Sequence, residues 1–199
     1  MRQEHDLLGY RELPDEAYYG VQTLRGAENF SITGVHLSVY PDFIKALAMV
    51  KQAAAQANYE LGLLEKPTAE AIIAACKEII AGKLHDQFPV DMVQGGAGTS
   101  TNMNANEVIA NRALELMGHH KGEYQFCHPN NHINLAQSTN DAYPTAAKLG
   151  NSSADAVGAT QGRITPLFLC WIPVLLLGIL DGKRGMKQAW PAALAAGVT

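Results

Sequence analysis

Cysteine is scarce in this chain of 199 residues, which has only three. Cys76, Cys127 and Cys170 lie far apart, form no CxxC pair and are odd in number. A disulfide framework needs an even set of cysteines, and a structural zinc site needs closely spaced ligands. The sequence therefore favours neither arrangement, and we interpret the cysteines as small core residues of a protein in a reducing compartment.

Clusters of basic residues are also missing before Gly150, where 11 lysines and arginines stand against 17 aspartates and glutamates. A nucleic-acid surface needs grouped lysine and arginine, so no nucleic-acid partner is expected. The opening stretch MRQEHDLLGYRELPDEAYYG has no basic segment followed by an apolar one. We therefore expect no signal peptide, and residues 1–149 are predicted to be cytoplasmic.

Long apolar runs are absent until residue 164, and then 17 residues from Ile164 to Leu180 carry no charge. This length is at the lower limit for crossing a bilayer, and Pro166 and Pro173 interrupt the segment. We expect an apolar transmembrane-like helix here, with a buried core helix as the alternative. The change in composition predicts two parts, residues 1–149 and residues 150–199.

Apolar residues at three- and four-residue spacing predict that the first part is mainly α-helical. One helix is expected over residues 42–62, a second from its N-cap Thr68 to Gly82, and a third over residues 104–117. Residues 8–35 mix glycine, proline and aromatic residues, which predicts loops and one small hairpin. The expected fold is an irregular N-terminal region followed by helices.

The segment QGGAGTSTNMNANEV, residues 94–108, brings glycines and hydroxyls to the beginning of a predicted helix. Glycines let the backbone approach a ligand, and free N–H groups at a helix start attract carboxylate or phosphate. This pattern predicts an anion site at Thr99, Ser100 and Thr101. The alternative is a capped loop in which Asn104 is the N-cap and Glu107 its partner. A nucleotide-binding P-loop is not expected, because its lysine is missing.

A second polar segment, HPNNHINLAQSTNDAYPT, covers residues 128–145. Its run Ser138-Thr139-Asn140 again places donors before an expected helix start, which a proline marks. Two such segments can hold the two ends of one small dianion. His128 and His132 are candidates for acid–base groups or metal ligands, with loop packing as the commoner role. We expect no metal, because the sequence has no HExxH motif.

These motifs resemble the aspartase/fumarase superfamily, and within it the aspartate ammonia-lyases. The likeness extends from about Glu4 to Leu149. It is carried by EHDLLGYRELPDEAYYGVQTLRGAENFSITG, DQFPVDMVQGGAGTSTNMNANEVIANRALELMGHHKGEY and PNNHINLAQSTNDAYPT. GAGTS and MGHHKGEY resemble the aspartases, whereas the sister fumarases usually carry serine where Ala97 stands.

The resemblance implies β-elimination of ammonia from L-aspartate to give fumarate, without a cofactor. A base removes the C3 proton, and hydrogen-bond donors hold the carbanion as an aci-carboxylate. The implied substrate-binding residues are Thr99, Ser138, Thr139 and Asn140, with Ser100 and Thr101 beside them. The resemblance also implies a second, outlying anion site at His128 and Asn130, where Asn131 departs from the usual aspartate.

Two segments of the family pattern do not occur in this sequence. They are the histidine-bearing segment of the central domain and the GSSxMPxKxN loop with the base serine, so no catalytic base is identified. The resemblance further implies a homotetramer held by central helices that this sequence lacks. We therefore expect the chain alone to be inactive, with a small dicarboxylate, L-aspartate or fumarate, as its ligand. A non-enzymatic fusion product and a fumarate hydratase-like lyase are the alternatives.

Residues 156–199 resemble a different family, the L-lactate permeases. The likeness is carried by VGATQGR, by the apolar run and by DGKRGMKQAWPAALAAGV, in that order. It implies a permease-like tail whose residues 164–199 associate with the inner membrane, the contact being made through residues 164–180.

Overall fold

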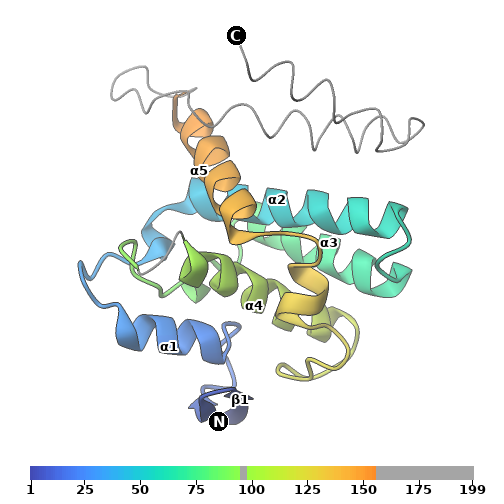
Figure 1. Cartoon of the computed structure of the whole chain (residues 1–199), viewed down its shortest axis with the longest axis horizontal. Helices are drawn as coiled ribbons and strands as arrows, with labels where there is room; N and C mark the ends of the chain where they lie inside the picture. The colour runs from blue at the N-terminus through green and yellow to red at the C-terminus, as the bar shows by residue number, and fades with distance from the viewer. Residues whose placement is uncertain (95–97, 156–199) are drawn as a thin grey trace. The chain divides into compact units, whose positions relative to one another are not determined.

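The computed structural model describes residues 1–94 and 98–155, which lie within one compact unit, Met1–Gly158 (Figure 1). The hairpin strands are β1 (Arg2–Asp6) and β2 (Gly9–Leu13). The α-helices are α1 (Val21–Asn29), α2 (Pro41–Glu60), α3 (Lys66–Ile80), α4 (Thr99–Leu116) and α5 (Thr139–Asp155). The short helices are η1 (Leu37–Val39), η2 (His85–Gln87) and the π-helical η3 (Pro129–Ile133).

The mainly helical fold predicted for the first part is confirmed for the described residues. The apolar helix expected at residues 164–180 lies outside them. Within residues 1–94 and 98–155, no helix is both long and apolar enough to cross a membrane.

Helix α4 is the centre of the packing. It contacts α1, α2, α3 and α5, while α2 lies between α3 and α5 (Figure 1). Thirteen of the 18 residues of α4 are buried, including four asparagines and a glutamate. Apolar side chains from α2, α3 and α4, such as Leu47, Ile72 and Ile109, form the core around it. A helix buried on several sides needs partners for all of its polar groups.

Two of the predicted helices agree closely with the structure. Helix α2 begins at Pro41 and ends at Glu60, and α3 ends at Ile80. However, α3 begins at Lys66, with Glu65 as its N-cap, so the prediction that Thr68 is the N-cap is wrong. Proline is favoured in the first turn because its missing N–H needs no partner there, which explains the earlier start.

The N-terminal region differs from the prediction. The hairpin pairs Arg2 with Leu13 and Asp6 with Gly9, so it lies nearer the N-terminus than residues 8–35. The expected loops contain a helix, α1, which is only nine residues long. Short helices are marginal on their own, so partners distant in the sequence must stabilise α1.

Those partners are buried carboxylates at the N-terminal end of α1. Glu107 in α4 accepts hydrogen bonds from the N–H groups of Gly20 (2.9 Å), Gln22 (2.9 Å) and Thr23 (3.0 Å). The alternative interpretation, in which Glu107 is the partner of an N-cap at Asn104, is therefore wrong, because both residues lie inside α4. Burial raises the pKa of Glu107 to about 7, and the donors at Thr23 and Gln22 oppose that rise.

We expect Glu107→Ala to lower the free energy of unfolding by about 3 kcal/mol, because three N–H groups at a buried helix start lose their acceptor. Glu107→Gln keeps one acceptor oxygen and is expected to cost less. Urea denaturation of the full chain, followed by circular dichroism, measures both. Glu70→Ala, at an exposed position of α3, is the control and is expected to change stability by less than about 0.5 kcal/mol. Equal losses for Glu107→Ala and the control would refute the capping role.

Candidate functional site

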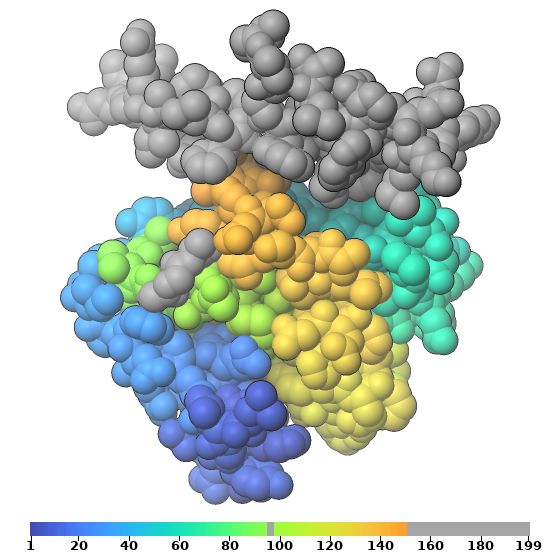
Figure 2. Space-filling view, in the orientation of Figure 1, coloured from blue at the N-terminus to red at the C-terminus, as the bar shows by residue number. Residues whose placement is uncertain are grey.

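The two polar segments singled out from the sequence meet at the starts of α4 and α5. Here the α4 start means residues 98–101, and the α5 start means residues 138–140. The side chain of Asn102 in α4 donates a hydrogen bond to the Thr139 hydroxyl at the α5 start (3.2 Å). Figure 2 shows the green α4 start and the orange α5 on the same face of the molecule. The structure therefore brings the two segments together, and the binding of a dianion between them stays a prediction.

The α4 start presents its three hydroxyl residues differently. Thr99 is exposed, Ser100 is half-buried and Thr101 is buried. The Gln94 side chain holds Thr101, because its oxygen accepts from the Thr101 N–H (2.9 Å) and its amide donates to the Thr101 hydroxyl (2.5 Å). The bond to Gln94 occupies the N–H group of Thr101. The N–H groups of Thr99 and Ser100 have no acceptor within the helix itself. Thr99 is thus the most accessible ligand-binding candidate of the three.

The third helix begins at Thr99, five residues before the predicted start at residue 104. The first turns of this helix are rich in polar residues and therefore lack the apolar spacing of a predicted helix. These residues form hydrogen bonds to distant parts of the chain, as in the bond from Asn104 to the carbonyl of Gln87 (3.0 Å). Similarly, α5 begins at Thr139, with Pro144 inside the helix instead of at its start. At the α5 start, Ser138 and Asn140 are exposed and Thr139 is half-buried.

A buried lysine lies beneath the α5 start, and the sequence analysis did not identify it. Lys51 in α2 is fully buried. Its ammonium donates to the side-chain oxygens of Asn134 (2.8 Å) and Gln137 (3.0 Å). Burial lowers the pKa of Lys51 to about 7. The available signal was a lysine among the apolar positions of α2, where a charged residue is rarely fully buried without partners.

The predicted outlying anion site lies at η3. His128 Nδ1 accepts from the N–H groups of Asn130 (3.0 Å) and Asn131 (3.3 Å), and His132 Nδ1 accepts from the His128 N–H (2.8 Å). Both rings therefore act as neutral caps of the chain at this turn. In the part of the chain that the structure describes, no three histidine, cysteine, aspartate or glutamate residues form a group that could hold a metal ion.

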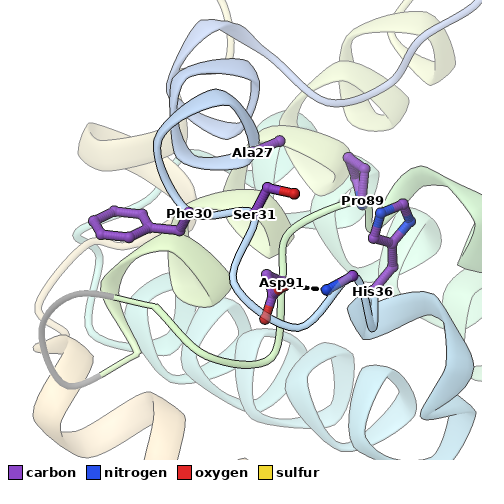
Figure 3. A pocket seen from close by; sticks show the side chains of 7 residues that line it. Ala27, Phe30, Ser31, His36, Pro89 and Asp91 are labelled. Atoms are coloured by element: carbon purple, nitrogen blue, oxygen red, sulfur yellow. Dashed lines mark hydrogen bonds between the residues drawn. The ribbon is translucent and has the colours of Figure 1, made fainter.

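A small pocket of about 120 Å³ lies between α1 and the segment around Pro89 (Figure 3). Asp91 lines it, and its carboxylate accepts from the N–H groups of Thr33 (2.8 Å) and Gly34 (2.9 Å) and from the Thr33 hydroxyl (2.8 Å). Burial raises the pKa of Asp91, but these bonds and one from Val93 outweigh it and lower the pKa to about 2. Asp91 thus serves to hold the turn at residues 32–34.

The described residues form a mainly helical unit in which two polar helix starts converge. A sequence model of the lyase family matches residues 9–156, which is most of the chain. The chain belongs to this family.

Comparison with individual proteins agrees with this assignment. The chain is 64% identical over 149 residues to an aspartate ammonia-lyase of Helicobacter pylori strain J99, covering 75% of this chain and 32% of the relative. It is 60% identical over 150 residues to the aspartate ammonia-lyase of Escherichia coli K12, covering 75% of this chain and 31% of the relative. The chain therefore spans about a third of the length of these curated relatives.

Solved structures give the same fold. A fumarate lyase:delta crystallin from Brucella melitensis matches with a TM-score of 0.77 and 56% identity, over 78% of this chain and 35% of the other. A class II fumarase from Schistosoma mansoni matches with a TM-score of 0.73 and 39% identity, over 78% of this chain and 32% of the other. The resemblance read from the motifs is confirmed as membership of the lyase family, whereas the roles of single residues stay predictions.

Gly98→Ala is expected to disturb the contact between the two helix starts. Gly98 has a φ of +83°, and a Cβ there would overlap the Tyr143 ring of α5. Gly118 has the same φ of +83° with nothing within 4 Å of its Cβ position, so Gly118→Ala is a matched control for backbone strain. We expect Gly98→Ala to cost about 2 kcal/mol more than the control in urea denaturation of the full chain. Equal losses would mean that the contact with Tyr143 yields easily.

The capping histidines predict a loss of stability in acid. Burial and the neighbouring His132 lower the pKa of His128, and burial lowers that of His132. Their contribution is complete above the unfolded pKa of about 6.5 and is lost as the pH falls through the folded values, because a protonated Nδ1 cannot accept. We expect His128→Asn to reduce the drop in unfolding free energy between pH of about 7.5 and about 5.5. The exposed His120→Asn is the control and should leave the drop unchanged.

Proposed function

We propose that residues 1–149 form the substrate-carboxylate-binding part of an aspartate ammonia-lyase-type C–N lyase, which converts L-aspartate to fumarate and ammonia. The observation that carries the proposal is the convergence of the α4 and α5 starts in a chain that is 60–65% identical to aspartate ammonia-lyases. Thr99 at the α4 start, and Ser138, Thr139 and Asn140 at the α5 start, are the proposed carboxylate ligands.

In this proposal the two helix starts act mainly when negative charge develops. A base removes a proton from C3 of L-aspartate, and the electron pair enters the adjacent carboxylate, which becomes an aci-carboxylate dianion. Hydroxyl and N–H donors stabilise that dianion more strongly than the ground-state carboxylate. The pair then returns to form the C2–C3 double bond, the C2–N bond breaks and ammonia leaves.

The base itself must come from elsewhere in the assembled enzyme, because this sequence holds no GSSxMPxKxN segment. The proposed ligand is a small dicarboxylate, L-aspartate or fumarate. The proposed assembly is the family homotetramer. Purified alone, the 199-residue chain is expected to release no fumarate. A non-enzymatic fusion product with a permease-like tail is the alternative. The tail, residues 156–199, lies outside the described residues, and membrane fractionation of the full chain tests its association.

Fumarate hydration is the competing chemistry within the same family. The identity of 60–65% to aspartate ammonia-lyases, against 39% to the class II fumarase, favours ammonia release over hydration. Ala97, the residue that favours the aspartase interpretation in the sequence, lies outside the described residues.

A chimera tests the proposal directly. Residues 1–149 replace the matching first third of the Helicobacter pylori aspartate ammonia-lyase, and fumarate formation is followed by its absorbance. We expect kcat/KM for L-aspartate within about tenfold of the parent enzyme, because the graft supplies equivalent donors. Thr99→Ala or Asn140→Ala in the chimera should lower kcat/KM by about 100-fold or more.

Asn29→Ala, at the exposed end of α1, is the matched control for Asn140→Ala and should leave kcat/KM unchanged. A tetrameric chimera that is inactive toward L-aspartate would overturn the proposal. Hydration of fumarate in place of its amination by the same chimera would support the hydratase alternative.

A further inference from the structure

We propose that Lys51 is a positioning residue that fixes the hydrogen-bond direction at the α5 start, so that the Thr139 hydroxyl donates to the substrate carboxylate. The inference rests on the proposed function, because it assigns a role at the same carboxylate site. A series of hydrogen bonds links Lys51 in α2 to α4 and to the α5 start.

The series of hydrogen bonds begins at Lys51, which in its ammonium form can only donate. The Lys51 ammonium has three N–H donors and no acceptor, and it lies 2.8 Å from Asn134 Oδ1 and 3.0 Å from Gln137 Oε1. Both amides must therefore turn their oxygens toward it. The oxygen and nitrogen ends of an amide have nearly the same shape, so packing alone does not choose between them.

The orientation of Asn134 then determines that of two asparagines in α4. Asn134 Oδ1 also accepts from Asn102 Nδ2 (3.1 Å) and from Asn106 Nδ2 (3.3 Å). The nitrogen of Asn102 has two hydrogens, and its second bond reaches Thr139 Oγ1 (3.2 Å). Thr139 is thus an acceptor on its inner side.

A threonine hydroxyl carries one hydrogen. Because Asn102 occupies an acceptor position of Thr139, that hydrogen can point away from α4. A carboxylate only accepts, so it requires a donor at this position. If the Asn134 and Asn102 amides were flipped, Asn102 would present its oxygen to Thr139. The Thr139 hydroxyl hydrogen would then point toward Asn102, and the lone pairs of the hydroxyl would face the ligand.

A second branch from Lys51 holds the backbone that leads to Ser138. With its oxygen on the ammonium, Gln137 directs its nitrogen to the carbonyls of Ile133 (2.8 Å) and Leu135 (3.3 Å). The same donor thereby sets both the direction of the Thr139 hydroxyl and the path of the chain before it.

The test uses the full chain, labelled with nitrogen-15 and titrated with fumarate at constant ionic strength. The amide shifts of Thr99 and Asn140 report binding. We expect Lys51→Met to raise the dissociation constant about tenfold, and Lys51→Arg, which also only donates, to stay within about threefold of the unchanged chain. Lys45→Met, a half-buried lysine of the same helix paired with Asp42, controls for the lost charge and should have little effect.

Two further variants separate positioning from charge and from folding. Asn102→Leu removes the link to Thr139 without changing charge, and it should weaken fumarate binding about as much as Lys51→Met. In a Thr139→Val background, Lys51→Met should add nothing, because the hydroxyl that it directs is gone. A merely structural lysine would instead give effects that add in the double variant.

The outcomes distinguish the two proposals. If fumarate shifts no amides at the two helix starts of the unchanged chain, the proposed carboxylate site fails, and the role of Lys51 fails with it. If the unchanged chain binds fumarate, and either Asn102→Leu binds equally well or the effects of Lys51→Met and Thr139→Val add, only the role of Lys51 is overturned.

Discussion

The burial of α4 is the constraint on which the rest of the structure depends. Thirteen of its 18 residues are buried, yet they include asparagines and a glutamate, each of which needs a partner inside the protein. The partners lie in segments that have little regular structure of their own. Asn104 holds the segment at Gln87, Asn111 holds the one at Tyr18, and Glu107 caps α1. The polar side of α4 therefore determines where these segments lie.

The same constraint explains the direction of the hydrogen bonds around α4. The side-chain oxygens of Asn102, Asn104 and Asn106 have no partner among the described residues, whereas all three nitrogens donate. An unpaired buried oxygen lowers the free energy of unfolding by about 1–3 kcal/mol, so this pattern destabilises the fold. It arises because the groups next to these three nitrogens are acceptors, namely the Gln87 carbonyl, the Thr139 hydroxyl and the Asn134 amide oxygen. Asn134 Oδ1 also accepts from the buried Lys51 ammonium, which links this lysine to the asparagines of α4.

The sequence alone was sufficient to predict the helices whose stability comes from residues near one another in the chain. The apolar spacing of α2 and α3 predicts both helices to within a few residues, since their buried faces follow the helical period. It was insufficient for α1 and for the first turns of α4, because their stability comes from distant partners. Glu107 and Asn104 look like capping residues in the sequence, but tertiary contacts with Gly20 and Gln87 place both inside the helix.

The site divides in the same way. Hydroxyl and amide side chains in both segments, with glycines in the first, were enough to single out the two donor-rich regions, because such regions are a local pattern. The exact first residues of α4 and α5 were not predicted. Lys51 was not identified, because a lysine in an amphipathic helix normally points to solvent. Its place among apolar positions was the one signal, and only the fold shows that Asn134 and Gln137 accept from it. Ligand contacts can be local in sequence, while the groups that orient them come from other elements.

The contacts between the α4 and α5 starts are all formed within the part of the lyase that this chain contains. The groups that hold the α4 and α5 starts together, from Lys51 to Tyr143, all lie within residues 51–143. The relative position of the α4 and α5 starts is therefore set by contacts inside this unit. Proton removal is different, because it requires a base at the right distance from C3, and the α4 and α5 starts offer hydroxyls, amides and backbone N–H groups in its place. Under the proposed function, binding and chemistry are therefore separable, with carboxylate binding placed in residues 1–149 and the base in another part of the enzyme.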